Sequence, residues 1–153
     1  PKTTQQLSHL ISQFDSRIVS IELKIDDLNW EECLEFVKKA LSDDKVAVVY
    51  TSREIRVESS ISQNLIKGRE ISMALVNLVK NLSIRPGFLI AKGGVTSSDV
   101  ATEVLGIKRA TVIGNVIPGV PVWRSEGCYA FVVFPGNVGG TESMKQAVER
   151  LME

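Results

Sequence analysis

Histidine is almost absent from this chain of 153 residues, and its scarcity excludes several kinds of catalytic site. His9 is the only histidine, so no pair of histidines can share a metal ion, and a catalytic triad would depend on that one residue. Because His9 stands beside the leucines of an amphipathic segment, we expect an ordinary surface or cap-adjacent histidine. Hydrolase chemistry of the usual kinds is therefore nearly excluded.

Cysteine, excess charge and long apolar runs are also scarce. Cys33 and Cys128 lie far apart in apolar segments, which favours free thiols of a cytoplasmic protein over a disulfide. Eighteen Lys and Arg balance eighteen Asp and Glu, so the chain lacks the basic surface of a nucleic-acid or membrane binder. No apolar run approaches the roughly 18 residues that span a bilayer, and the first residues lack a signal-peptide pattern.

What is present is the composition of one globular domain, with 44% hydrophobic residues and regular apolar patterning. Apolar residues recur every three or four positions in the predicted helices, and short apolar or alternating runs mark the predicted strands. Helices are predicted for residues 4–14, 30–41, 65–82, 98–105 and 144–151, with Leu65 among the inward-facing residues of the third. Strands are predicted for residues 17–23, 45–51, 88–94, 110–113 and 128–134. A polar segment, residues 52–63, is predicted to be a long loop or lid.

The alternation of helices and strands predicts an α/β fold with three layers, a mostly parallel sheet and helices on both faces. The strands after residue 107 are close enough together to run antiparallel. Residues 1–153 are expected to form a single domain. Because the chain opens on a helix with Pro1 in first place, we expect that its first strand is missing and that it is a fragment or a processed protein.

The clearest chemical signal lies in residues 91–100 (AKGGVTSSDV), where a buried strand ends in two glycines just before a helix. Glycines at such a turn let backbone amides approach an anion, and the first helical turn adds unpaired donors. Thr96, Ser97 and Ser98 could add hydroxyl donors. The alternative is a capping box formed by Thr96 and Asp99, which needs no ligand.

A second glycine-rich turn follows another buried strand at residues 134–141 (FPGNVGGT). Each turn alone is compatible with a purely structural role. Two such turns at the carboxyl ends of strands in one sheet favour a shared crevice for an anion or nucleotide. Between them, residues 117–123 (IPGVPVW) form a rigid apolar segment, in which Trp123 either belongs to the core or lines a base. Lys2 and Lys92 either point at a phosphate or are solvated.

Three segments in this order, GGVTSSD, PGVPVW and PGNVGG, resemble the C-terminal nucleotide-binding domain of the four-carbon acid sugar kinase family. The resemblance covers nearly the whole chain. It implies binding of ATP with Mg²⁺, and an N-terminal domain, absent here, that binds a tetronate or 3-oxo-tetronate for phosphorylation at the 4-position. A Gly-Ser turn of the family would lie upstream of Pro1. The nucleotide-binding residues that the resemblance implies are Gly93, Gly94, Val95, Thr96, Ser97, Ser98, Asp99, Gly136, Asn137, Gly139 and Gly140.

On this interpretation Asp99 acts through Mg²⁺, since a bare carboxylate beside phosphates is repulsive. The isolated chain is expected to bind nucleotide without turnover, because nothing in it aligns an acceptor hydroxyl. A homodimer is compatible with the sequence. The alternative is a non-catalytic module for a phosphorylated metabolite or a partner protein. A nicotinamide-dependent dehydrogenase ranks third, because the dinucleotide glycine spacing is missing.

Overall fold

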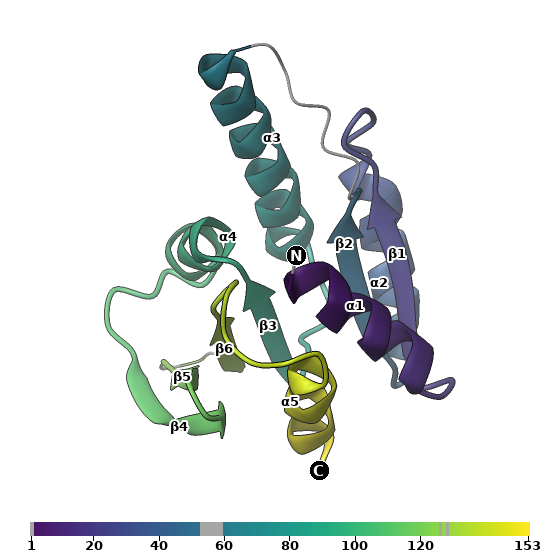
Figure 1. The fold of residues 1–153 in the computed structure, drawn as a ribbon, viewed down its shortest axis with the longest axis vertical. Coiled ribbons are helices and arrows are strands. Elements are labelled where there is room, and N and C mark those ends of the chain that lie inside the picture. Colours follow the sequence, from purple (N-terminus) through teal and green to yellow (C-terminus); the bar gives the residue numbers. More distant parts are fainter. Residues whose placement is uncertain (1, 53–59, 126, 128) are drawn as a thin grey trace. The chain divides into compact units, whose positions relative to one another are not determined.

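Helices and strands alternate along the chain in a computed structural model that describes residues 2–52, 60–125, 127 and 129–153 (Figure 1). The chain divides into two units, which we describe separately. One unit comprises Arg17–Ile84, and the other joins the first sixteen residues to Arg85–Glu153.

The unit of residues 17–84 contains two strands and two helices. Strand β1 (Ile18–Leu23) pairs in parallel with β2 (Val46–Thr51), and the helices are α2 (Trp30–Ser42) and α3 (Ile61–Lys80). Side-chain oxygens cap both helices, since Asn29 accepts from the Glu32 amide and Ser60 from the Gln63 amide. Helix α2 packs on both strands and on α3. The core of the unit contains Leu23, Cys33, Leu34, Val37, Ala74 and Leu78.

Helix α3 begins earlier than predicted and exposes a residue that was expected to face inward. Residues 53–59 of the predicted loop lie outside the described residues, and residues 61–63 are helical rather than part of a loop. The prediction that Leu65 faces inward is wrong, because 71% of its surface is exposed. Ile61, Ile66 and Met73 of the same helix are also exposed. Helix α3 therefore presents an apolar face between Ile61 and Met73 that this unit does not bury.

The second unit is built on a four-stranded sheet with the order β3-β6-β5-β4. Strands β3 (Phe88–Lys92) and β6 (Ala130–Phe134) are parallel, and β5 (Val120–Arg124) runs antiparallel to both β6 and β4 (Thr111–Ile117). Its helices are α1 (Lys2–Gln13), α4 (Gly94–Asp99), which continues as a π-helix over Val100–Val104, and α5 (Ser143–Met152). Helix α4 packs against β3 and β6, and α5 packs against β4 and α1.

The directions of these strands determine which loops share an edge of the sheet. The carboxyl ends of β3 and β6 lie at one edge, and the β4–β5 hairpin turn lies at that same edge because β5 opposes β6. The amino ends of β3 and β6, the end of β5 and the start of β4 lie at the opposite edge, where Phe88 pairs with Ala130 and Thr111 with Arg124. The three glycine-containing turns singled out in the sequence therefore share one edge.

The sequence predicted most of this unit, with several differences. Strand β5 was not predicted, because most of its residues fall in the expected rigid apolar segment of residues 117–123. Strand β4 extends to Ile117 beyond the expected end at residue 113, because register shifts around Gly114 and Asn115 keep it paired through the glycine. Helix α4 begins at Gly94 rather than Ser98. Ile11 of α1 is 39% exposed, whereas Leu7 and Leu10 are buried as expected.

The predicted α/β class is confirmed, with parallel strands in both units and antiparallel strands after residue 107. No helix in the described part of the chain is long and apolar enough to cross a membrane.

Because Cys33 is buried, the stability of its unit should fall at alkaline pH. Burial raises the pKa of this thiol, and the negative charge of Glu32 raises it further. The folded chain therefore keeps the thiol proton to a higher pH than the unfolded chain does. The stabilisation that the buried, protonated thiol contributes is complete below the pKa of the unfolded thiol, about 8.5. It is lost as the pH rises through the pKa of the folded thiol.

We expect the free energy of unfolding of the wild-type chain to fall more steeply with pH above about 8.5 than that of Cys33→Ala, by up to about 1.4 kcal/mol per pH unit. Urea denaturation at a series of pH values measures both slopes. Equal slopes would contradict a buried, protonated Cys33.

Candidate functional site

The two glycine-rich loops start beside each other because they leave neighbouring parallel strands. The Gly93 amide donates to the Phe134 carbonyl at 3.1 Å. The Lys92 ammonium donates to the Pro135 carbonyl at 3.1 Å and lies 4.0 Å from the centre of the Phe134 ring. These contacts join the carboxyl ends of β3 and β6, which are neighbouring strands (Figure 1). The carboxyl edge of a sheet is where open α/β folds usually bind ligands.

The turn after β3 is held by Ser97 from inside the protein. Gly93 has φ of +107°, a conformation that side chains disfavour, and it precedes the helix directly. The buried Ser97 hydroxyl lies 2.9 Å from the Ala91 carbonyl and 2.6 Å from the Gly93 carbonyl, so its single proton is shared between them. The Ser97 amide also donates to the Gly93 carbonyl. Ser97 therefore shapes the turn rather than presenting its hydroxyl to solvent.

The alternative of a capping box at Thr96 and Asp99 is wrong. The residue that precedes the helix is Gly93, and no side chain caps this helix end. Thr96 lies within the first turn, since α4 begins at Gly94. The amides of Gly94, Val95 and Thr96 thus belong to the first helical turn, whose donors have no partner inside a helix.

Three side chains of α1 hold the loop after β6 by its carbonyl groups. The Lys2 ammonium donates to the Asn137 carbonyl at 3.2 Å, and the Thr3 hydroxyl lies 3.5 Å from the Gly136 carbonyl. Gln6 is 1% exposed, and its Nε2 donates to the carbonyls of residues 138 and 140 at 3.0 and 2.9 Å. Its Oε1 is buried without a partner in the described part of the chain. The Gln6 side chain therefore donates two hydrogen bonds to the loop, while its own carbonyl oxygen is buried without a donor, which is unfavourable.

The end of this loop is fixed against α5. The Gly140 amide donates to the Ser143 hydroxyl at 2.9 Å, and the Ser143 amide returns a bond to the Gly140 carbonyl. Gly139 has φ of +81°, and a Cβ placed there would collide with the Ser143 side chain. Only glycine fits this position without rearrangement.

The consequence for chemistry is that the loop carbonyls face α1 while several amides remain available. Within the described residues, the amides of Gly136, Asn137 and Gly139 have no protein acceptor. Those amides and the first-turn amides of α4 lie at one edge of the sheet, beside the Lys2 and Lys92 ammonium groups. Clustered backbone donors and nearby positive charge form a suitable environment for an anion.

The β4–β5 turn completes this edge from the other side of β6. A Cβ on Gly119, which has φ of +79°, would lie 3.3 Å from Val138 Cγ1, so the hairpin turn contacts the loop after β6. Trp123 packs edge-on against Phe131, with ring centres 6.2 Å apart. This contact favours the core over the base-lining alternative for Trp123.

The other predicted site residues differ in how far they are exposed to solvent. The exposed ones are Gly94, Val95, Ser98, Gly136, Asn137 and Gly140. The half-buried ones are Gly93, Thr96, Asp99 and Gly139. Asp99 is the only carboxylate among them. No cluster of three or more His, Cys, Asp or Glu in the described ranges could hold a metal ion by itself. A magnesium ion here would have to bring most of its ligands with it, as nucleotide phosphates and water do.

The side chains that support the second loop, above all Gln6 and Ser143, were not predicted from the sequence. A signal for Gln6 was present, because it is a polar residue on the same helical face as the buried Leu7 and Leu10. Its partners lie more than 130 residues away, and helical periodicity contains no information about them.

The close packing at Gly139 generates a stability prediction with an internal control. Gly139→Ala should lower the free energy of unfolding by about 2–4 kcal/mol, because it adds left-handed strain and a steric collision. Gly136→Ala should change it by less than about 0.5 kcal/mol, since a methyl group there would have nothing within 4 Å and the φ of Gly136 is ordinary. Chemical denaturation measures both variants, and equal losses would contradict this loop geometry.

Known structures share this fold over nearly the whole chain, at 19% sequence identity. A putative tRNA synthase from Salmonella typhimurium LT2 has a TM-score of 0.68 and a Haemophilus influenzae protein of the DUF1537 family one of 0.74, over 95% and 97% of this chain. A DUF1537 domain from Bordetella bronchiseptica, a domain-swapped dimer with bound citrate, has a TM-score of 0.66 over 99%. This chain spans only 37–38% of those chains.

No curated protein matches the chain in sequence. A family model, described as the nucleotide-binding C-terminal domain, matches residues 1–144 and so includes both glycine-rich loops. Its match extends over nearly the full length and agrees with the DUF1537 structural neighbours. The chain thus belongs to the family of nucleotide-binding C-terminal domains.

Proposed function

We propose that this chain is the ATP-binding part of a cytoplasmic small-molecule kinase that phosphorylates a four-carbon acid sugar, a tetronate or 3-oxo-tetronate, at the 4-position. The observation that carries the proposal is the junction of the two glycine-rich loops, where the Gly93 amide meets the Phe134 carbonyl. That junction brings the amides of both loops to one edge of the sheet in a domain whose family binds nucleotides.

The backbone donors and the two lysines at this edge would suit the negative charge of the ATP phosphates. Amides of Gly94, Val95 and Thr96 would donate to phosphate oxygens from one loop, and those of Gly136, Asn137 and Gly139 from the other. The missing Cβ atoms at the glycines allow close approach of phosphate to backbone. Lys2 and Lys92 would add positive charge while keeping their bonds to the loop carbonyls.

Ser97 and Ser98 take different parts in this proposal. Ser97 acts as a positioning residue, because its hydroxyl and amide are both bonded to the turn that it supports. Ser98 is not buried, and its hydroxyl would donate to phosphate. Gly140 bonds through its amide to Ser143 and therefore supports the loop from behind.

Magnesium would be held by Asp99 together with the nucleotide. A single carboxylate plus phosphate oxygens and water is a common arrangement for this ion. The ion supplies neutralisation of phosphate charge, and Asp99 is tolerated beside phosphates only in its presence.

The acid-sugar acceptor would be bound outside this chain. The chain spans just over a third of its structural neighbours, which leaves room in a full-length protein for a substrate-binding domain. The Bordetella neighbour contains citrate, which is, like an acid sugar, a small hydroxy acid. Phosphoryl transfer needs the acceptor hydroxyl aligned with the γ-phosphate. The chain alone would therefore bind ATP without transferring its phosphate.

Isothermal titration calorimetry with ATP and ADP, with and without Mg²⁺, tests the binding site. We expect the wild-type chain to bind both nucleotides. Gly139→Ala should weaken binding about tenfold or more, because it displaces the loop amides (each tenfold corresponds to about 1.4 kcal/mol). Asp99→Asn should remove the part of ATP affinity that depends on Mg²⁺ and should strengthen metal-free ADP binding, because it removes a carboxylate that repels the phosphates.

Gly68→Ala is the matched control, because Gly68 lies on α3 in the other unit with nothing within 4 Å of a methyl group there. It should bind nucleotide like the wild type. Absence of binding by the wild type, or equal losses in Gly139→Ala and Gly68→Ala, would refute the site. Binding of other phosphorylated metabolites in preference to ATP would favour the alternative, a non-catalytic module.

We also propose that the chain forms a homodimer. The Bordetella neighbours are domain-swapped dimers, and the exposed Ile61, Leu65, Ile66 and Met73 give α3 an apolar face of the kind that marks interfaces. Light scattering should give twice the chain mass for the wild type and a monomer mass for the variant Leu65→Glu/Met73→Glu. A monomeric wild type across the micromolar range would contradict the proposal.

A further inference from the structure

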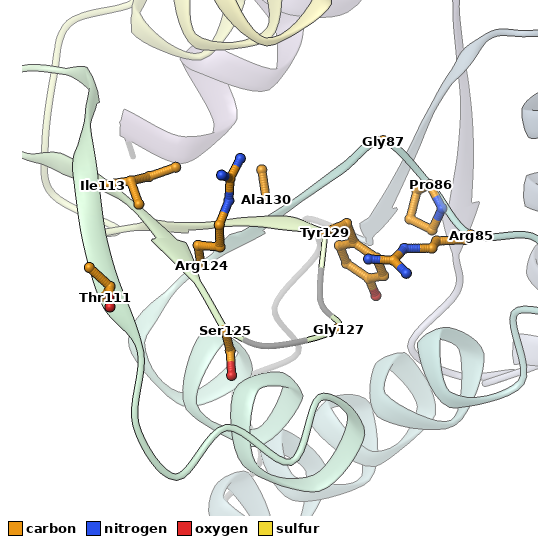
Figure 2. A pocket seen from close by; sticks show the side chains of 10 residues that line it. All are labelled: Arg85, Pro86, Gly87, Thr111, Ile113, Arg124, Ser125, Gly127, Tyr129 and Ala130. Carbon is orange, nitrogen blue, oxygen red and sulfur yellow. The ribbon is translucent and has the colours of Figure 1, made fainter.

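A cavity lies at the edge of the four-stranded sheet opposite the two glycine-rich loops. It has a volume of about 800 Å³, within the usual range for small-molecule sites, and its lining comes from four elements (Figure 2). Arg85 precedes β3, Thr111 starts β4, Arg124 ends β5 and Ala130 starts β6. The pairing of Thr111 with Arg124, and of Phe88 with Ala130, brings these segments to one edge.

The described lining of this cavity, which we call the arginine basin, carries two positive charges and no negative one. Arg85 and Arg124 both reach solvent, and neither forms an ion pair with a carboxylate in the described part of the chain. The Arg85 guanidinium lies 5.9 Å from the centre of the Tyr129 ring, an arrangement that orients its planar group. Two like charges, with no carboxylate among the described residues that line the cavity, favour an anionic occupant; Glu126, which follows Ser125, lies outside the described residues.

The two guanidinium groups belong to different sides of the basin. Figure 2 shows Arg85 beside Tyr129 on one side and Arg124 on the side that Ile113 and Ala130 line. Apolar groups, including Pro86 and Ile113, also line the basin. A guanidinium offers a planar fork of N–H donors that matches carboxylate and phosphate oxygens. The matching ligand carries an anionic group at each end of a short carbon chain.

We propose that the arginine basin binds a small organic dianion, with one carboxylate or phosphate on Arg85 and the other on Arg124. The site does not depend on the proposed kinase function, because it uses no residue of the glycine-rich loops. It gives this domain a second ligand site. That site lies at the edge of the sheet opposite the carboxyl ends of the parallel strands, where open α/β folds usually bind their ligand.

Calorimetric titration of the chain with dicarboxylates of increasing length, from succinate to pimelate, tests the basin at constant ionic strength. One length should bind best, and it should bind at least tenfold more tightly than the monocarboxylate with the same number of carbons. Arg85→Gln and Arg124→Gln should each reduce dicarboxylate affinity about tenfold, to near the monocarboxylate level. Arg124→Lys should recover part of the loss, because it keeps the charge without the fork.

Two controls separate this site from the loops and from general charge effects. Arg69→Gln removes an exposed arginine of α3 and should leave dicarboxylate binding unchanged. Gly139→Ala should weaken nucleotide binding and leave dicarboxylate binding unchanged, so failure of one site is distinguishable from failure of the other. The same series with α,ω-alkanediol bisphosphates, which carry one phosphate at each end, identifies which anionic group is preferred. No dicarboxylate binding, no preference over monocarboxylates, or full binding by Arg85→Gln/Arg124→Gln would overturn the proposal.

Discussion

Parallel pairing of β3 with β6 is the constraint on which the candidate nucleotide site depends. Parallel neighbours release their following loops at the same edge, and here the Gly93 amide is bonded to the Phe134 carbonyl across that junction. The β4–β5 hairpin lies between these strands in the sequence and joins the sheet without displacing either loop. Two turns that could each be purely structural thus become one surface of backbone donors.

The loops differ in how they are held. The turn after β3 is supported locally by Ser97, six residues beyond Ala91. The loop after β6 is supported by α1, from the other end of the chain, through Lys2, Thr3 and Gln6. Because these side chains bond the loop through its carbonyls, they leave its amides for a ligand. Gln6 contributes most, since it is buried and contacts two carbonyls at once.

The sequence predicted what depends on local pattern. Apolar periodicity located α2 and α5, and the run of residues 45–51 located β2 to within one residue. Local pattern failed where distant contacts decide the outcome. The predicted strand ended at residue 113, but pairing with β5 continues β4 through Gly114 to Ile117. Leu65 fits an inward stripe of α3, yet the unit provides no partner for it.

The same distinction applies to the site. Glycine-rich turns after apolar strands are visible in the sequence, and the resemblance to acid sugar kinases assigned them to ATP. The clamp by Gln6 and the collision that requires glycine at position 139 arise from segments over 130 residues apart or from particular backbone angles. The arginine basin was likewise invisible, because Arg85 and Arg124 come together only through strand order and register.

Binding of one nucleotide by the amides of both glycine-rich loops would be visible in a crystal structure of the chain with ADP and Mg²⁺. We expect phosphate oxygens within hydrogen-bond distance of amides from both loops, one set at residues 94–96 and the other at residues 136, 137 and 139. Nucleotide bound at the arginine edge, or phosphates contacting one loop alone, would contradict this expectation.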